Sequence, residues 1–180
     1  MDDYFPFTYN KKKKEVFAFC KSNGKDNEIW VQLIEKAWAK ICGSYEASEM
    51  GRCSEFLQNF DGTPTEIHWT EDFDTPDKKE DMYRLMSIAD RNGWVMTSSC
   101  LKRMSPQLAD LPLNTMKTLG IKNCHSYSVL DVKEVILDTG EIEFMVFLRN
   151  PTGNFFLKEG DVWKGDYSAL SSKWTDKLRD

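Results

Sequence analysis

The sequence predicts an α+β fold in which an antiparallel sheet is packed with a long buried helix. Residues 125–135 and 142–148 have the alternating apolar pattern of strands, and a turn at 138–141 joins them. Apolar residues recur at three-to-four spacing over 27–42, which is typical of a helix with one apolar face. The length of 180 residues and the hydrophobic content of 41% fit one globular domain with a substantial core.

The first twenty residues predict two short extended segments joined by a lysine-rich turn. Residues 2–7 read as an extended segment with a turn at Pro6, and 16–20 read as a short apolar strand. The lysines at 11–14 could form a nucleic-acid patch, but the chain has a net charge of −5. We therefore expect a solvated turn, and neither nucleic acid nor an anionic membrane as a partner.

The most strongly patterned element is the helix over 27–42. Asn27 is a suitable N-cap, and Gly43 supplies the stop. We expect this helix to be buried along one side and central to the core, with Glu35 and Lys36 off the buried stripe. The stripe consists of Ile29, Trp30, Leu33, Ile34, Ala37, Trp38 and Ile41.

Four further segments complete the prediction. A short helix is expected over 54–60, and a second long helix over 77–92 with Gly93 as its cap. Residues 94–100 read as a short buried strand, and 101–120 as a loop that serves as an ordinary connection rather than a lid. The apolar stripe of the second long helix consists of Met82, Leu85, Met86 and Ala89.

Cysteine and histidine usage argues against a metal centre. The five cysteines contain no C-x-x-C pair, and two histidines are too few for an ordinary structural zinc site. His68 stands alone and is expected to be packed or solvent-facing, and the acids of 71–77 lack the glycine and closing glutamate of an EF-hand. We predict no cofactor and no metal.

The same cysteine usage bears on location. Reduced thiols indicate a cytoplasmic protein, free or within a cytoskeletal or other large assembly. The N-terminus has no charged-then-apolar signal segment. No apolar run approaches the roughly 18–20 residues of a membrane span.

The hairpin brings His125 and Asn150 to the same end. A mirror count about the turn puts Val129 opposite Asn150, so His125 reaches Asn150 only with a bulge or an offset. A histidine oriented by an asparagine is the base-and-orienter half of a cysteine-peptidase site, and the nucleophile is missing. The alternative is a strand-end histidine that is hydrogen bonded for stability alone.

Several blocks of the chain resemble the calpain family of cysteine peptidases. Residues 33–45 are similar to the long-helix motif of the family, and 124–129 to the block that carries its active-site histidine. Residues 149–153 resemble its asparagine block, usually RNPWG. Three shorter matches complete the resemblance at 2–6, 163–165 and 171–174.

The resemblance implies a papain-like fold split into two lobes. It identifies residues 1–180 as a single subdomain, the second or C-terminal lobe of the protease core, incomplete at both ends. His125 would be the general base, and Asn150 would fix the tautomer of its imidazole. The cysteine nucleophile of the family belongs to the first lobe.

The sequence departs from the family pattern at the nucleophile and beside the asparagine. No cysteine lies in a Gly-x-Cys-Trp context, and the period-two rule puts Cys124 on the strand face opposite His125. Thr152 replaces the tryptophan that shields the histidine–asparagine hydrogen bond in the family. These departures predict a pair of vestigial catalytic positions, His125 and Asn150.

A calcium site is not expected either. Val162 and Ala169 stand where the resemblance places two calcium-binding carboxylates, and apolar side chains do not bind a hard cation. A displaced site at Asp161 and Asp166 is the alternative.

The sequence therefore predicts a calpain-like lobe that is inactive on its own and acts as a pseudopeptidase structural or protein-interaction module. Its partner would be another protein or a missing cysteine lobe. The alternative is the His/Asn lobe of an active calpain-type endopeptidase, whose cysteine lobe lies in further sequence or in another chain. A third hypothesis is a regulatory lobe that pairs with an active calpain.

Overall fold

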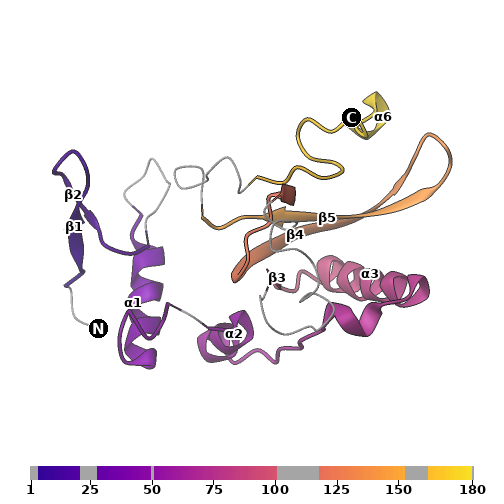
Figure 1. The fold of residues 1–180 in the computed structure, drawn as a ribbon. Coiled ribbons are helices and arrows are strands. Elements are labelled where there is room, and N and C mark those ends of the chain that lie inside the picture. The colour runs from indigo at the N-terminus through magenta and orange to yellow at the C-terminus, as the bar shows by residue number, and fades with distance from the viewer. Residues whose placement is uncertain (1–3, 21–27, 50, 101–117, 153–161, 180) are drawn as a thin grey trace. The chain divides into compact units, whose positions relative to one another are not determined.

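The protein forms two compact units, Met1–Ile67 and His68–Asp180 (Figure 1). The computed structural model describes residues 4–20, 28–49, 51–100, 118–152 and 162–179. Helices and antiparallel strands both occur among them, which confirms the α+β class. None of the helices in these ranges is long and apolar enough to cross a membrane.

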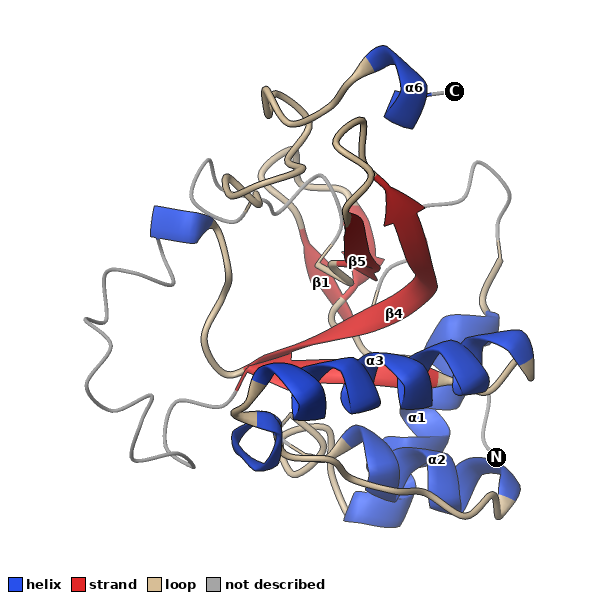
Figure 2. Cartoon of the chain, turned by 90° about the vertical axis from the view of Figure 1, so that its right-hand side faces the viewer, coloured by secondary structure: helices blue, strands red, loops and turns tan. Residues whose placement is uncertain are grey.

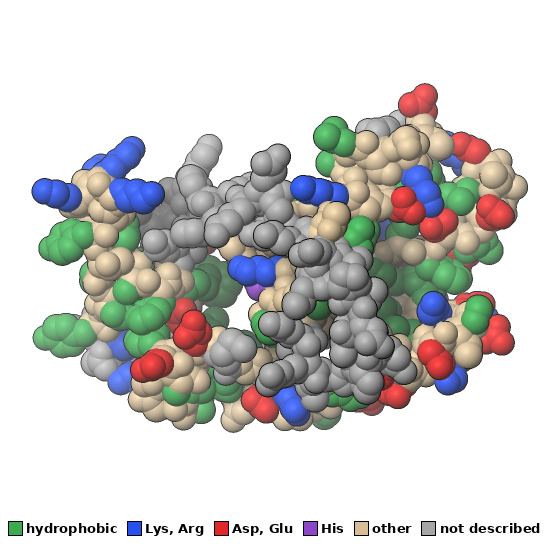
Figure 3. All heavy atoms as spheres, viewed as in Figure 1, with side chains coloured by type: hydrophobic (Ala, Val, Ile, Leu, Met, Phe, Trp, Pro, Cys, Tyr) green, Lys and Arg blue, Asp and Glu red, His purple; other side chains and the backbone are tan. Residues whose placement is uncertain are grey.

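The first unit begins with a two-stranded antiparallel hairpin. Strand β1 (Phe7–Tyr9) pairs with β2 (Glu15–Phe17). In the turn between them, Asn10 Oδ1 accepts hydrogen bonds from the backbone N–H groups of Lys12, at 2.8 Å, and Lys14, at 3.1 Å. The lysines of this turn are exposed, and Figure 3 shows basic side chains at the tip of the hairpin. The predicted solvated turn is confirmed.

The helices of the first unit are α1 (Trp30–Cys42) and α2 (Cys53–Asp61). Both end at a glycine in the left-handed conformation, Gly43 with φ 98° and Gly62 with φ 75°, which side chains with a Cβ rarely adopt. Helix α1 begins later than predicted, and the expected cap Asn27 lies outside the described residues.

The prediction that the apolar stripe of α1 is buried holds only in part, because the stripe is half-buried in the middle of the helix and exposed at both ends. The buried residues of α1 are Gln32, Lys36 and Ala39, whereas Trp30 is 58% and Ile41 63% exposed. Polar contacts account for the difference, because they tie the other side of the helix to the N-terminal segment.

Two of these contacts are specific. Glu35 Oε2 accepts a hydrogen bond from the Cys20 backbone N–H at 2.9 Å. The Lys36 ammonium donates to the Tyr4 carbonyl and lies 4.9 Å from the centre of the Phe5 ring. A buried lysine is tolerated when its charge has partners of this kind.

The second unit contains a three-stranded antiparallel sheet in the order β3-β4-β5. The strands are β3 (Met96–Cys100), β4 (His125–Ile136) and β5 (Ile142–Arg149), and the predicted hairpin is β4 and β5. Helix α3 (Pro76–Arg91) lies along the sheet, as Figure 2 shows. Shorter elements are η1 (Thr70–Phe73) and α6 (Asp176–Arg179).

Helix α3 contacts the sheet through an aromatic stack. The rings of Tyr83 and Phe144 are 4.1 Å apart between centroids, with an interplanar angle of 23°. Tyr83 is the buried residue of α3. The predicted stripe missed it and included Leu85, which is 46% exposed. The helix is therefore turned on its axis relative to the prediction.

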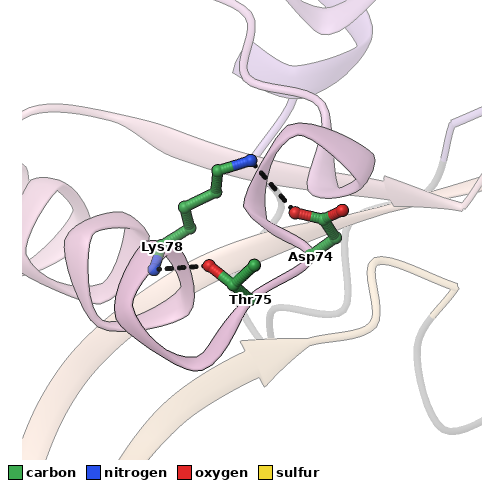
Figure 4. A network of polar contacts seen from close by, with 3 residues as sticks. All are labelled: Asp74, Thr75 and Lys78. Carbon is green, nitrogen blue, oxygen red and sulfur yellow. Dashed lines mark hydrogen bonds and ion pairs between the residues drawn. The ribbon is translucent and has the colours of Figure 1, made fainter.

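The start of α3 is fixed by its sequence (Figure 4). Thr75 Oγ1 accepts a hydrogen bond from the Lys78 backbone N–H at 3.4 Å, and Pro76 occupies the first helical turn. The Lys78 ammonium also pairs with the Asp74 carboxylate at 3.0 Å.

The strand predicted over 94–100 is confirmed as β3, but its predicted burial is wrong, because three of its five residues are exposed. Strand β3 is shorter, and the two residues before it, Trp94 and Val95, are 64% and 73% exposed. Within the described residues β3 pairs with β4 alone, so one of its edges lacks a neighbouring strand. Of the loop predicted over 101–120, residues 101–117 lie outside the described residues. The prediction of an ordinary connection rather than a lid therefore stays a prediction.

Two tryptophan motifs near the C-terminus, Trp163–Gly165 and Ser171–Trp174, determine how the backbone of that segment turns. A Cβ on Gly165 would lie 2.2 Å from the Trp163 ring. The absence of a side chain at Gly165 therefore leaves room for the indole. Trp163 Nε1 donates to the Asp166 carbonyl at 2.7 Å, and Trp174 Nε1 donates to the Ser168 carbonyl at 2.8 Å. Both indoles therefore close turns of their own segment.

The same segment is anchored beside the start of the hairpin. Lys164 N–H donates to the Leu119 carbonyl at 2.9 Å. A Cβ on the buried Gly120, whose φ is 79°, would lie 1.7 Å from the Val162 carbonyl oxygen. The two backbones approach so closely that only glycine fits there.

Candidate functional site

A β-bulge sets which residue of β5 faces the histidine. Val132 pairs with Val146 and continues in regular register to Asp131 and Phe147, but Val129 then pairs with Leu148. Leu130 is therefore the extra residue on β4.

The bulge changes the face that Asn150 shares. Ser128 pairs with Arg149, so the ladder continues to Asn150 opposite Tyr127. Without the bulge Asn150 would lie opposite Ser128, whose side chain points to the other face. Tyr127 and His125 are two residues apart, and thus the bulge puts Asn150 on the face of His125.

The polar atoms of the pair are in hydrogen-bonding contact. His125 Nε2 lies 2.8 Å from Asn150 Oδ1, as expected from the hairpin. Asn150 Oδ1 also accepts the backbone N–H of Thr152 at 3.0 Å, and the Thr152 hydroxyl lies 3.3 Å from His125 Nε2. The side chains of all three residues are half-buried.

This geometry determines the tautomer of the neutral imidazole. The Thr152 backbone N–H can only donate, so the amide atom that faces it is the oxygen of Asn150. The same oxygen faces His125 Nε2, which therefore carries the proton. His125 Nδ1 is then the unprotonated nitrogen, able to accept a proton.

The other end of the amide lacks an acceptor. Asn150 Nδ2 is buried and has no hydrogen-bond partner among the described residues. Flipping the amide would not repair this, because Nδ2 would then face the Thr152 N–H, donor against donor.

An aromatic contact fixes the imidazole from the side. The rings of His125 and Tyr127 lie edge to face, 5.0 Å apart at an interplanar angle of 88°. The Tyr127 hydroxyl accepts a hydrogen bond from the Lys122 backbone N–H at 3.0 Å. The imidazole is thus held by a polar pair at Nε2 and by a ring that is itself tethered.

Sequence reasoning missed the thiol nearest to His125 in the ladder. Cys100 is the cross-strand partner of His125 on β3, so the two side chains lie on the same face. Burial, and secondarily the neighbouring Cys124, raises the pKa of the Cys100 thiol. Its Sγ lies 3.7 Å from Asn123 Oδ1. A protonated thiol is a weak nucleophile, so this arrangement is the opposite of an activated cysteine.

Cys124 is placed differently from the prediction. It precedes β4 with a φ of 52° and is exposed, so the alternation of the strand does not apply to it. The five cysteines are all free thiols. His125 has no hydrogen bond to a cysteine within the described part of the chain.

The residues near the tryptophan motifs do not fit a calcium ion. The side chain of Val162 is apolar and 49% exposed, and the side chain of Ala169 has no ligand atom. The Asp166 carboxylate pairs with the Lys173 ammonium at 2.8 Å, and Asp161 lies outside the described residues. The described ranges contain no group of three or more His, Cys, Asp or Glu side chains placed to hold a metal ion.

Comparison with known proteins gives the family. The model of the calpain family cysteine proteases matches residues 1–180. Calpain-5 of Rattus norvegicus is 33% identical over 97% of this chain, and the catalytic subunit of calpain-1 of Homo sapiens is 34% identical over 98% of it.

The match covers only part of each relative. The chain corresponds to 26% of the length of rat calpain-5 and to 21% of the length of the human calpain-1 catalytic subunit. The match nevertheless covers the whole chain and includes the hydrogen-bonded histidine and asparagine. The chain belongs to the calpain family of cysteine proteases.

Proposed function

We propose that this chain is the His/Asn lobe of a calpain-like, papain-type fold that is inactive alone and acts as a pseudopeptidase structural or protein-interaction module. The observation that carries this is the 2.8 Å contact between His125 Nε2 and Asn150 Oδ1, in a histidine that has no hydrogen bond to a cysteine among the described residues. The nearest thiol in the ladder, Cys100, has a raised pKa. The base and its orienter are built, but proteolysis also needs an activated cysteine.

The proposal assigns residues 1–180 to one subdomain of the protease core. His125 and Asn150 are then the positional equivalents of catalytic residues, and Thr152 stands where the family has an indole. Five free thiols support a cytoplasmic location. The partner is a protein chain rather than nucleic acid or a membrane.

One observation favours the active alternative. The tautomer that Asn150 and Thr152 impose leaves Nδ1 of His125 free to accept a proton from a thiol. In this alternative a cysteine lobe from further sequence or another chain completes an endopeptidase. The relatives are about four to five times longer than the matched region, so they contain sequence beyond it.

The rate at which the purified chain hydrolyses a fluorogenic peptide tests whether it is active on its own. His125→Ala is the matched control, because it removes the base and leaves every cysteine in place. We expect the wild type and the variant to release the fluorophore at the same rate, with and without added calcium. Hydrolysis that depends on His125 would sink the pseudopeptidase proposal.

Mixing the chain with a separately prepared cysteine lobe of a calpain relative tests the alternative. If activity appears with the wild-type chain and not with His125→Ala, the chain is the His/Asn half of an active enzyme. For the module, affinity purification from native cells should yield a stable, stoichiometric protein partner. Recovery of the chain alone would contradict an interaction role.

A further inference from the structure

We propose that Thr152 is a positioning residue that helps to fix the ring orientation of His125 through its side-chain hydroxyl. This inference rests on the proposed function, because it concerns the same histidine–asparagine pair. The calpain pattern has an apolar indole at this position, whereas here a hydroxyl lies 3.3 Å from the imidazole nitrogen.

The Nε2 proton of His125 is shared between two acceptors. His125 Nε2 carries the proton, since it faces Asn150 Oδ1 at 2.8 Å. The Thr152 hydroxyl oxygen, at 3.3 Å from the same nitrogen, is a second acceptor for that N–H. The contact is longer than the one to Asn150, so it acts as the weaker arm of a three-centre hydrogen bond.

Thr152 contacts both the Asn150 amide and the His125 imidazole. The Thr152 backbone N–H donates to Asn150 Oδ1 at 3.0 Å, and its hydroxyl reaches the imidazole that donates to the same oxygen. One residue thus contacts both members of the pair. A rotation of the imidazole about its Cβ–Cγ bond would break both contacts at Nε2 and not only the one to Asn150.

The Thr152 hydroxyl stands where the calpain pattern has an indole ring. A hydrogen bond between a histidine and an asparagine weakens when water competes for its atoms. An apolar ring would exclude water from the bond, but a threonine side chain is too small to cover it. A hydroxyl instead supplies a competing acceptor that is already fixed in place. The consequence is a polar restraint on the ring where the family uses an apolar cover.

Nitrogen-15 NMR of the full chain measures this restraint directly. The protein has two histidines, so each imidazole gives its own signals, and His68 serves as an internal reference. The signals are assigned with His125→Gln, and spectra are recorded at an alkaline pH at which the shifts show a neutral ring. The shifts report the tautomer, and the Nε2 proton gives an exchange rate with water.

Thr152→Val removes the hydroxyl and keeps the shape of the side chain. We expect the Nε2 proton of His125 to exchange about fivefold faster in this variant, as befits the loss of one weak hydrogen bond. Thr152→Ser should restore the wild-type rate. Thr97→Val is the matched control. Thr97 lies on β3 and pairs with Ser128 of β4 rather than with His125, so its substitution should leave the exchange rate unchanged.

Each outcome has a definite meaning. A wild-type exchange rate in Thr152→Val overturns the role of the hydroxyl. If that variant does not fold, Thr152→Ala gives the same comparison without added volume. Asn150→Ala separates this inference from the proposed function. If Asn150→Ala shifts the tautomer and Thr152→Val does not change exchange, only the inference about Thr152 fails. If Asn150→Ala has no effect, the pair itself is not a functional unit.

Discussion

His125 Nε2 lies 2.8 Å from Asn150 Oδ1 because Leu130 is an extra residue in strand β4. The bulge puts the side chains of residues 125, 127 and 129 on the same face as that of Val132. Val132 is 6% exposed and pairs with Val146, so this face is the one that packs toward the interior of the second unit. The histidine therefore stands at the end of a packed face.

The Trp163–Gly165 contact predicts a local loss of stability on substitution. Gly165→Ala would place a Cβ 2.2 Å from the Trp163 ring, and the indole would have to move. We expect a loss of about 1–3 kcal/mol in the free energy of unfolding of the second unit, as is typical for overpacking.

Tryptophan fluorescence during urea unfolding measures this change. Gly51→Ala is the control, since nothing lies within 4 Å of a Cβ at that position. If both variants unfold like the wild type, the indole does not pack on Gly165.

The N-terminus of α3 gives a second stability prediction. Thr75→Ala removes the oxygen that accepts the Lys78 backbone N–H at 3.4 Å. We expect a loss of about 0.5–1 kcal/mol, at the low end for N-caps because the bond is long. Circular dichroism during thermal unfolding provides the measurement.

The ion pair at the same helix end supplies the comparison. Asp74 and Lys78 are both more than half exposed, so Asp74→Asn should change stability less than Thr75→Ala does. A larger effect of Asp74→Asn would assign the stabilisation to charge rather than to the cap.

The half-buried Cys100 and the buried Tyr83 predict a loss of stability at alkaline pH. Burial raises the pKa of the Cys100 thiol, so above its ordinary value of about 8.5 the unfolded chain releases this proton before the folded protein does. The unfolded state then binds fewer protons, and the free energy of unfolding falls as pH rises from that value to the raised pKa. Below about pH 8 this contribution to stability is fully present.

Urea unfolding at a series of pH values tests this. Cys100→Ser should flatten the decline that begins near pH 8.5. Tyr83, whose pKa is raised chiefly by burial and then by Glu134, adds a decline above about pH 10, and Tyr83→Phe should remove it. The interpretation is wrong if the wild type and Cys100→Ser lose stability in parallel over the lower range.

The local pattern of the chain predicted its elements better than their packing. The hairpin of β4 and β5 and the glycine that ends α1 follow from alternation and from backbone freedom, which are local properties. The buried side of α1 does not, because it is decided by Lys36 and Glu35, which contact the N-terminal segment. A hydrophobic pattern cannot predict the burial of a polar side chain that finds its hydrogen-bond partners in a distant part of the sequence.

The bulge shows where a better sequence signal existed. The apolar residues of β4 run through Val129 on odd positions and resume at Val132 on an even one. This change of phase marks an extra residue in the strand. The mirror count that pairs Asn150 with Val129 ignores this residue and is also one position off beside the turn, where Ile136 pairs with Ile142. Cys100 could not have been found this way, because its pairing with His125 depends on the register of a strand distant in sequence.

We propose above that no cysteine of this chain acts as a nucleophile with His125. The direct measurement is mass spectrometric mapping of a peptidyl epoxide directed at cysteine peptidases, with the wild type compared with His125→Ala. Labelling should be slow and governed by exposure, with Cys124 first and Cys100 last, and His125→Ala should not change it. Rapid labelling of one cysteine that disappears in His125→Ala would contradict the claim and show a working cysteine–histidine pair.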